Sequence, residues 1–319
     1  MQAAVVEKYG PPEVVRIREV ATPEPAAGEV LVKSHATTVN SGDARLRAAR
    51  VPRGMALLVR LRVGITGPRQ SILGFETAGE VEVVGEGVTD LQVGDRVVAS
   101  RGFKFGCHAE KVAVKADGEV AKIPEGLSYA DAVSLLFGGS TALHFLRKGK
   151  LAGGESILVN GASGAVGTLA VQLAKHLGAE VTAVCSAEHA ELVTGLGADH
   201  VVDYATEDFT RNGERYDVIM DNHGNAPYKR VEGSLAPGGR FLMVVGDLWQ
   251  TLASMGQKPV TAGTAAVTGP VYQEILAMAA AGTLRPVIDS TLPFTDIVEA
   301  HRRVDAGHKA GSLVLTFDA

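Results

Sequence analysis

The sequence predicts an α/β protein that combines a mostly antiparallel β domain with a doubly wound parallel-sheet domain. Three observations support this prediction. The chain has 319 residues, which is long for a single compact domain. Val- and Ile-rich runs bounded by Gly, Pro or Asp dominate the first 120 or so residues. From about residue 124, strand-like apolar runs alternate with helical patterns.

The first part is expected to consist of strands and turns. Strand-like runs cover residues 28–40, 78–88 and 94–100, and turn-forming residues bound each of them. One helical interruption is expected near residues 43–62, where leucines and a methionine are scattered among arginines. This pattern favours an antiparallel sheet with one helix beside it.

The second part begins with residues 128–148, which predict two helical pieces broken at Gly138-Gly139. A regular series then follows, with strands over 156–161, 180–186, 200–204, 216–222 and 240–246 and helices over 164–177, 187–197 and 226–236. Such alternation is typical of βαβ units around a parallel sheet that is covered on both faces.

The C-terminal tail, residues 285–317, returns to a strand, a helix and a strand. It is expected to rejoin the first domain, so that the nucleotide domain is an insertion between two halves. The predicted domains are therefore residues 1–123 together with 271–319, and residues 124–270.

A glycine-rich loop joins the first strand of the series to its helix. Gly161, Gly164 and Gly167 are spaced by three, and the residues between and after them, Ser163, Ala165 and Val166, are small or apolar. A strand that enters a helix through such a loop leaves backbone N–H groups free to bind a phosphate. We expect dinucleotide binding here, and the alternative is a turn that needs small residues only for packing.

The end of the next strand bears on the choice of cofactor. NAD-binding folds place a carboxylate there, about 20 residues after the loop, to bind the ribose 2′-hydroxyl. This chain has Cys185 and Ser186 instead, with His189 nearby. A neutral hydroxyl tolerates a 2′-phosphate, so NADP(H) is favoured over NAD. The alternative role of Ser186 is to cap the following helix.

Composition excludes several other classes of function. The net charge of −5 gives no overall attraction to nucleic acid or to anionic membranes. No apolar run approaches the roughly 20 residues of a membrane helix, and the first residues do not resemble a signal peptide. Cys107 and Cys185 are the only cysteines and make no disulfide framework, so a cytoplasmic location is expected.

Several stretches together resemble the medium-chain dehydrogenase/reductase superfamily, most closely its zinc-free quinone oxidoreductase (zeta-crystallin-like) branch. They are residues 72–99, 135–146, 159–179, 196–204 and 235–246, and with the tail they span nearly the whole chain. The resemblance implies a GroES-like catalytic domain and a Rossmann cofactor domain. It also implies a homodimer, paired through sheet edges near residues 240–265.

The chain departs from the zinc-dependent members of this family. Those relatives have a cysteine ligand where this chain has Ser41 and a Gly-His-Glu where it has Gly-Phe75-Glu. Their structural zinc lobe has four cysteines, whereas the corresponding stretch here has only Cys107. Tetrahedral zinc needs three or four N, S or O ligands within reach, so no metal site is expected.

The resemblance also assigns roles to single residues. It places Asn40 near the nicotinamide and the substrate, with Asp43 close behind, although Asn40–Asp43 is also a good turn sequence. It implies that cofactor contacts are also made by Thr141, Asn222, Val245, Gly246 and, at the 2′-phosphate, Tyr204. His189 stands where some relatives have a lysine.

Residues 45–69 contain seven arginines and no lysine, aspartate or glutamate. One interpretation is an anionic partner such as nucleic acid, an acyl-CoA or a carboxylated substrate. The favoured one is a cover helix with a solvated basic face, because the net charge is negative and the segment lacks aromatic residues for base stacking.

The expected function is therefore a zinc-independent, NADPH-dependent oxidoreductase that transfers a hydride to a quinone or an α,β-unsaturated carbonyl. An electrophilic acceptor of this kind needs hydrogen-bond donors at its oxygen rather than a metal. An enoyl-thioester reductase or another carbonyl reductase is the alternative enzyme. A non-catalytic nucleotide-binding protein, crystallin-like or RNA-binding, is the alternative of another class. Expected partners are a small electrophilic substrate, with no nucleic acid and no membrane.

Overall fold

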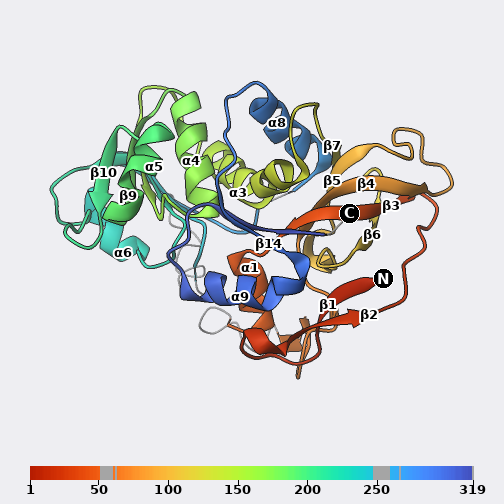
Figure 1. Cartoon of the computed structure of the whole chain (residues 1–319). Coiled ribbons are helices and arrows are strands. Elements are labelled where there is room, and N and C mark those ends of the chain that lie inside the picture. The colour runs from red at the N-terminus through yellow and green to blue at the C-terminus, as the bar shows by residue number, and fades with distance from the viewer. Residues whose placement is uncertain (51–59, 62, 247–258, 266, 318–319) are drawn as a thin grey trace.

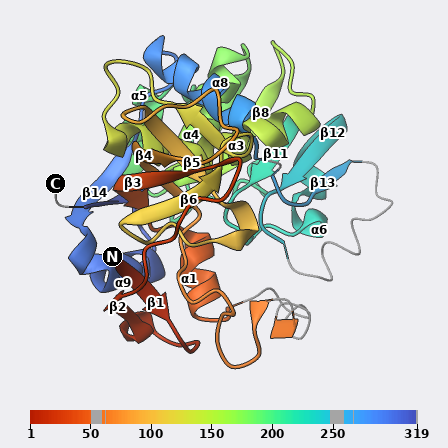
Figure 2. The same ribbon diagram turned by 90° about the vertical axis from the view of Figure 1, so that its right-hand side faces the viewer.

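The structure, a computed structural model, describes residues 1–50, 60–61, 63–246, 259–265 and 267–317. Two sheets form its framework, one mostly antiparallel and one parallel, with a long helix, α3, between them (Figure 1). Turned by 90°, the molecule shows both chain ends on the side of the antiparallel sheet (Figure 2). The α/β class predicted from the sequence is confirmed.

The antiparallel part is a seven-stranded sheet in the order β14-β15-β3-β4-β5-β7, with β6 paired to β3. Only β14 and β15 run parallel to each other. The strands are β3 (Glu29–Thr38), β4 (Glu76–Val84), β5 (Arg96–Ser100), β6 (Lys111–Lys115), β7 (Val120–Lys122), β14 (Ile288–Pro293) and β15 (Ser312–Thr316). Beside it lie β1 (Gln2–Val6), β2 (Val15–Glu19), α1 (Ser41–Arg47) and α9 (Ile297–Ala306).

The tail returns to this first sheet, as the sequence predicts. Val314 of β15 pairs with Thr38 of β3, and β14 then pairs with β15. The predicted domain limits at residues 123 and 270 stay a proposal. The second of them falls inside helix α8 (Gly269–Ala280), which packs on α3 and on β7.

The parallel sheet has the strand order β10-β9-β8-β11-β12-β13. Its strands are β8 (Ser156–Asn160), β9 (Glu180–Cys185), β10 (His200–Asp203), β11 (Tyr216–Asp221), β12 (Leu235–Met243) and β13 (Val260–Ala262), and its helices are α4 (Ala165–His176), α5 (Ala190–Gly195) and α6 (Tyr228–Val231). Numbered along the chain, the strands follow the order 3-2-1-4-5-6 of the Rossmann fold. Dinucleotides bind where this order reverses, which is between β8 and β11.

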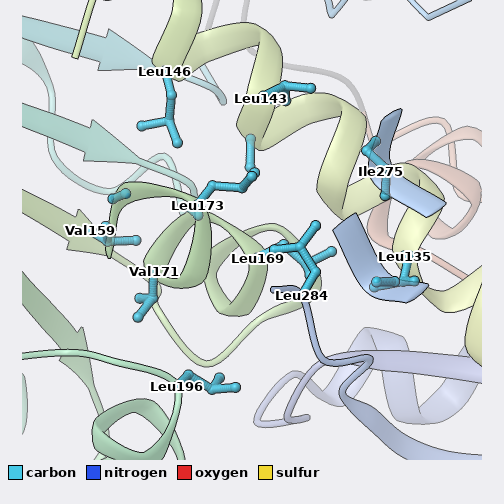
Figure 3. Close-up of a cluster of buried hydrophobic side chains, with 14 of the residues drawn as sticks. Leu135, Leu143, Leu146, Val159, Leu169, Val171, Leu173, Leu196, Ile275 and Leu284 are labelled. Carbon is cyan, nitrogen blue, oxygen red and sulfur yellow. The ribbon is translucent and has the colours of Figure 1, made fainter. Parts of the chain in front are cut away.

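Side chains that alternate along β8 fill two different cores. Ile157 and Val159 lie in the core that contains α3 and α4, whereas Leu158 lies in the core on the opposite face with Phe241. The larger core contains the residues of Figure 3 and also reaches the antiparallel sheet through Val314 of β15. The two sheets therefore share one continuous apolar core.

Helix α3 (Tyr129–Lys148) is continuous, so the predicted break at Gly138-Gly139 is wrong. The two glycines are places of close packing instead. A Cβ on Gly138 would lie 2.1 Å from the carbonyl oxygen of Ala165, and one on Gly139 would lie 3.2 Å from Ile275. Helix α3 tolerates the low helical propensity of glycine because α4 and α8 pack against it at these positions.

The helix predicted over 226–236 is also shorter than expected. Helix α6 ends at Val231, a 3₁₀ turn follows, and β12 already begins at Leu235. Leu235 pairs with Tyr216 at the start of β11, and this pairing requires extended backbone. The helix expected over 43–62 is observed as α1, which ends at Arg47, while residues 51–59 and 62 lie outside the described residues.

A buried ion pair joins helix α1 to helix α9. The guanidinium of Arg47 is fully buried and lies 2.5 Å from the carboxylate of Asp305, which also pairs with the exposed Arg50. Two arginines of the basic segment thus share one carboxylate partner within the chain, which offsets one of their two charges. Cys107 and Cys185 are free buried thiols. Within the described part of the chain, no helix has the length and apolar composition needed to cross a membrane.

We expect Asp305→Ala to lower the free energy of unfolding by about 3 kcal/mol, because it leaves the buried Arg47 charge without its partner. Chemical denaturation measures this loss. Glu274→Ala, which removes an exposed pair with Arg147, is the control and should cost no more than about 1 kcal/mol. Equal losses in the two variants would contradict the structural role of the buried pair.

Candidate functional site

The glycine loop between β8 and α4 has the geometry of a phosphate-binding turn. Gly161 has a φ of +77°, which a side chain would strain, and its N–H and that of Ala162 donate to the carbonyl of Val184 in β9. A Cβ on Gly167 would lie 2.1 Å from the Gly161 oxygen, so only glycine lets α4 pack this close to the loop. Packing therefore explains Gly161 and Gly167.

Gly164 has a different environment. It is the N-cap of α4, its φ is −75°, and the nearest atom to a Cβ placed there would be the Gly161 oxygen at 3.7 Å. No side chain caps the helix, so the N–H groups of its first turn, which includes Ala165 and Val166, lack a side-chain acceptor. The helix dipole and these donors favour an anion. The packing-turn alternative does not explain why residue 164 lacks a side chain.

The tail of the chain touches the same loop. The N–H of Gly311 donates to the carbonyl of Ser163 at 2.8 Å, and Gly164 and Gly311 form an isolated parallel bridge. A Cβ on Gly311 would lie 2.1 Å from the carbonyl oxygen of Val287. The carbonyl of Ser163 thus binds the C-terminal tail. The side chain of Ser163 stays available for other contacts.

Polar side chains gather where the strand order reverses. Asn160 at the end of β8 donates through Nδ2 to Asp221 at the end of β11 and to Asn225, both at 2.8 Å. The Asp221 carboxylate also accepts from the backbone N–H groups of residues 223, 224 and 226. This network fixes the loop after β11 and holds Asn222 beside it.

The Asn222 side chain is left free by this network. Its Nδ2 and Oδ1 atoms are buried and have no partner among the described residues. Val245 and Gly246 follow the neighbouring strand β12, and Val245 packs against the turn at Gly224. A buried amide without partners costs free energy unless a ligand satisfies it. Asn222 therefore fits the predicted contact with a cofactor.

Ser186, His189 and Tyr204 lie near the ends of two adjacent strands. The N–H of Tyr204 donates to the carbonyl of Cys185, and the 3₁₀ turn that contains His189 begins directly after Ser186. The Ser186 hydroxyl makes no capping bond to that turn, although capping was its alternative role. The Tyr204 ring is 55% exposed. The three side chains are thus free to meet a 2′-phosphate.

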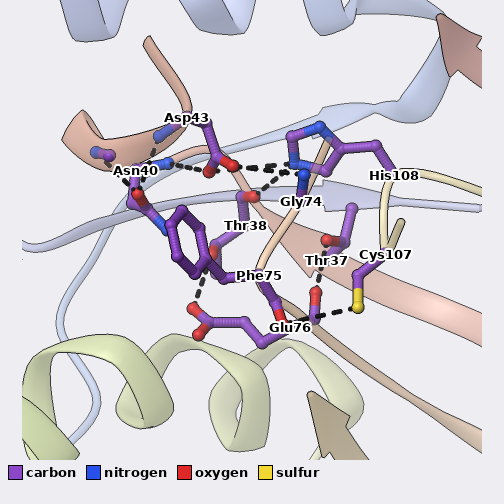
Figure 4. Close-up of polar contacts among 10 residues, drawn as sticks. Thr37, Thr38, Asn40, Asp43, Gly74, Phe75, Glu76, Cys107 and His108 are labelled. Carbon is purple, nitrogen blue, oxygen red and sulfur yellow. Dashed lines mark hydrogen bonds and ion pairs between the residues drawn. The ribbon is translucent and has the colours of Figure 1, made fainter. Parts of the chain in front are cut away.

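Asn40 and Asp43 begin helix α1 and cap it mutually. Asn40 Oδ1 accepts from the N–H groups of Gly42 and Asp43, and Asp43 Oδ2 accepts from the Asn40 N–H at 3.0 Å (Figure 4). This arrangement fixes the Asn40 amide in one orientation. Its Nδ2 is buried and has no partner among the described residues, so it is available as a donor.

Asp43 lies at the centre of a buried polar cluster rather than facing solvent. Oδ1 of Asp43 accepts from the N–H of Gly74. The imidazole Nε2 of His108 lies 3.9 Å from Oδ2 of Asp43. Burial raises the pKa of Asp43 above its usual value, and His108 opposes this rise. Nε2 of His108 donates to the carbonyl of Thr38 at 2.9 Å. Asp43 thus holds the backbone of Asn40 through its Oδ2 atom, and the catalytic roles of both residues stay predictions.

A second buried carboxyl, Glu76, lies on the first residue of β4. Thr38 Oγ1 donates to Glu76 Oε1 at 2.7 Å, and the nearby backbone of Phe137 also favours the charged form of this carboxyl. Burial raises the pKa of Glu76 to about 8. The preceding residue, Phe75, packs its ring against Phe137 at 5.9 Å and close to Gly42. In Figure 4 the Phe75 ring lies between Asn40 and Glu76.

Helix α3 brings the two halves of the site together. Phe137 contacts Phe75 and Glu76 on the side of the antiparallel sheet, and the next residue, Gly138, contacts Ala165 at the start of α4. Thr141 is buried one helical turn after Phe137 and so lies on the same face of α3. Helix α3 therefore contacts Phe75 of the antiparallel part and the start of α4 through two consecutive residues.

The positions of the zinc ligands in zinc-dependent relatives are occupied by Ser41 and Phe75, whose side chains do not suit zinc. In the described ranges, no group of three or more His, Cys, Asp and Glu side chains is placed to hold a metal ion. Zinc independence stays a prediction that rests on these residue types.

Comparisons with known proteins define the class. Residues 26–125 match the family model described as alcohol dehydrogenase GroES-like domain. Residues 196–315 match the model described as zinc-binding dehydrogenase. Together with the strand order, these matches define a dehydrogenase/reductase with a GroES-like domain and a Rossmann-like domain.

Similarity to individual proteins indicates the branch of this class. The chain is 32% identical to the mitochondrial NAD(P)H oxidoreductase RTN4IP1 of Mus musculus, over 99% of this chain and 89% of the relative. It is 30% identical to the chloroplastic NADPH-dependent alkenal/one oxidoreductase of Arabidopsis thaliana, over 99% and 79%. The quinone oxidoreductase from Coxiella burnetii has a similar structure, with a TM-score of 0.89, 27% identity and 99% coverage of both chains.

The chain belongs to the medium-chain dehydrogenase/reductase superfamily, in its quinone oxidoreductase-like branch. The family and the fold predicted from the sequence are thereby confirmed. The individual site residues stay predictions. Helix α3 contacts both Phe75, which lies beside Asn40 in Figure 4, and Ala165 at the start of α4.

Sequence reasoning did not single out Glu76, His108, Asn160 or Asp221. Asn160 and Asp221 gave a signal, because each is a polar residue at the end of an apolar strand. His108 gave none, since its partners Thr38 and Asp43 lie more than 60 residues away in the sequence. The structure places His108 in the buried cluster.

We expect Gly164→Ala and Gly167→Ala to have different effects. A methyl group at residue 164 enters space that the protein leaves open, so the variant should fold normally but bind NADPH at least about tenfold more weakly. A methyl group at residue 167 collides with the loop and should cost about 1–3 kcal/mol of stability or more. Fluorescence titration with NADPH and thermal unfolding measure the two effects. Unchanged NADPH affinity in Gly164→Ala would refute the phosphate site.

The raised pKa of Glu76 predicts a pH dependence of stability. Between its usual value near 4.5 and its folded value of about 8, the folded state holds a proton that the unfolded state releases. The free energy of unfolding should therefore fall as pH rises through this range, by up to about 1.4 kcal/mol per pH unit. Denaturation at several pH values should show that Glu76→Gln removes this slope. A slope that persists in the variant would assign it to other groups.

Proposed function

We propose that the chain is a zinc-independent reductase that uses NADPH to reduce a quinone or an α,β-unsaturated carbonyl. The observation that supports it most is the junction at α3. There, consecutive residues Phe137 and Gly138 contact the cluster around Asn40 on one side and the uncapped helix α4 on the other. A cofactor held by its phosphates at α4 would extend along α3 towards the cluster around Asn40.

The residues present fit NADPH. The N–H groups at the start of α4 would bind the pyrophosphate, and the unpartnered amide of Asn222 would bind a neighbouring part of the cofactor. Ser186, Tyr204 and His189 would meet the 2′-phosphate without a carboxylate at the end of β9 to repel it. Bound NADPH supplies the hydride for the reduction.

Asn40 has the geometry of an oxyanion donor. Its Oδ1 is held by two backbone N–H groups, so its free Nδ2 donor has a fixed direction. A donor that is already oriented stabilises negative charge on a substrate oxygen without reorganisation during the reaction. A substrate that is already electrophilic needs no further activation by a metal. The known relatives that reduce quinones and alkenals are in accord with such substrates.

Reduction of enoyl thioesters or of other carbonyl compounds is the alternative within the enzyme class. Binding of nucleotides or RNA without turnover is the alternative outside it. The pairing of Arg47 and Arg50 with Asp305 speaks against the second alternative, since it neutralises part of the basic segment. Pairing into a homodimer through the sheet edge at β13 (Val260–Ala262) and a cytoplasmic location belong to this proposal, and gel filtration and cell fractionation would test them.

An assay with several acceptors tests the function. NADPH absorbance is followed with quinones, enones, enoyl thioesters and simple aldehydes at equal concentrations. We expect the highest kcat/KM with quinones or enones. Tight NADPH binding without oxidation by any acceptor would contradict an enzymatic function and favour nucleotide binding alone.

We expect Ser186→Asp to weaken NADPH binding by about tenfold or more and to leave NADH binding nearly unchanged. The introduced carboxylate repels the 2′-phosphate and accepts hydrogen bonds from a free 2′-hydroxyl. Titration of the variant with both cofactors measures the two dissociation constants. Ser186→Ala, which adds no charge, is the control. Equal losses for the two cofactors in Ser186→Asp would refute the 2′-phosphate assignment.

A further inference from the structure

Glu76 is a buried carboxyl group that the proposed function does not yet use. Glu76 is 2% exposed, and it accepts a hydrogen bond from the Thr38 hydroxyl. Among the described residues, no lysine or arginine forms an ion pair with Glu76. Those that do form ion pairs have other carboxylates as partners. A carboxylate buried without a cation is unfavourable, so a neutral acid is favoured at this position.

Groups from several elements interact with Glu76. Thr38 comes from β3, Asp43 from α1, and the backbone of Phe137 from α3. The phenol of Tyr272 on α8 and the thiol of Cys107 also interact with its charge. None of these five groups is cationic at neutral pH. The hydrogen bonds favour the charged form, but burial has the larger effect and raises the pKa of Glu76 to about 8.

Thr38 connects this acid to the free amide of Asn40. Thr38 is the last residue of β3, and Asn40 follows two residues later. Side chains two residues apart in an extended chain lie on the same face, and the backbone of Asn40 is still extended. The hydroxyl of Thr38 and the Nδ2 donor of Asn40 therefore lie on one side of the strand, with the Phe75 ring beside them in Figure 4.

We propose that Glu76 and Thr38 form the proton supply of this site, in which Glu76 stores the proton and Thr38 passes it to the reduced substrate. The proposal rests on the proposed function and adds to it the source of the second hydrogen. The hydride adds to the electrophilic carbon or quinone oxygen, and the electron pair moves to a substrate oxygen held by Asn40. The Thr38 O–H bond breaks as its proton joins that oxygen.

Glu76 replaces the proton that Thr38 gives to the substrate. In the empty site the Thr38 hydroxyl donates to Glu76, so it first rotates about its C–O bond until its hydrogen faces the substrate oxygen and Oγ1 accepts from the Glu76 acid. As Thr38 releases its proton, it takes the proton of the Glu76 carboxylic acid, and Glu76 becomes a carboxylate. A proton from water then restores the acid before the next turnover. This order requires Glu76 to be neutral when the substrate binds, so the rate should fall at a pH above about 8, where the acid ionises.

The test compares pH–rate profiles of the full-length protein and of two variant pairs. Glu76→Gln keeps an acceptor for Thr38 but holds no acidic proton. We expect its kcat to fall about a hundredfold or more and the decrease above pH 8 to disappear, while NADPH affinity is unchanged. Glu82→Gln removes a carboxylate from the same strand that pairs with Lys111, and it should retain the wild-type profile.

The second pair isolates the relay. Thr38→Val has a similar volume without the hydroxyl and should lose activity as Glu76→Gln does, whereas Thr38→Ser keeps a hydroxyl and should restore most of it. Infrared difference spectra of wild type minus Glu76→Gln, recorded at pH 7 without substrate, should contain the carbonyl band of a neutral carboxylic acid. This readout needs no turnover.

The outcomes are distinguishable. An unchanged alkaline limb in Glu76→Gln, an active Thr38→Val, or an infrared band of an ionised carboxylate at pH 7 would each overturn the proton supply while leaving the reductase function intact. Failure of the wild-type protein to oxidise NADPH with any acceptor would overturn the proposed function, and the proton supply with it.

Discussion

The close approach of helix α3 to the start of helix α4 is the constraint on which the rest of the structure depends. Gly138 allows it, because any side chain there would collide with the carbonyl of Ala165. Helix α3 also forms part of the core that reaches from the parallel sheet to the antiparallel sheet. The distance between the phosphate loop and the Asn40 cluster is therefore set by backbone packing, which varies less than side-chain contacts do.

Buried polar groups near this junction share one feature. Asn40, Asn222 and Glu76 are held in place by the protein, yet each is left with an unsatisfied amide or an uncompensated carboxyl. Such groups reduce the stability of the empty protein. A bound cofactor and substrate would satisfy the two amides, so binding should stabilise the fold as well as complete the site.

Much of the fold was predictable because it depends on local patterns. The alternation of strands and helices, the glycine loop and the return of the tail all follow from short-range sequence signals. The break predicted at Gly138-Gly139 was wrong, since contacts with Ala165 and Ile275 outweigh the helical cost of glycine. The links of His108 to Thr38 and of Arg47 to Asp305 join distant parts of the chain, and no local pattern indicates such pairs.

The bridge between Gly164 and Gly311 has a consequence for the order in which the protein assembles. Gly311, whose N–H binds the loop at Ser163, comes much later in the sequence and is translated well after the loop. Strand β3 is likewise translated well before β15, one of its neighbours in the sheet. During synthesis the loop therefore lacks this contact at a time when β8 and α4, on either side of it, are already complete. A nascent chain would then gain full cofactor affinity only after the segment around Gly311 has been translated.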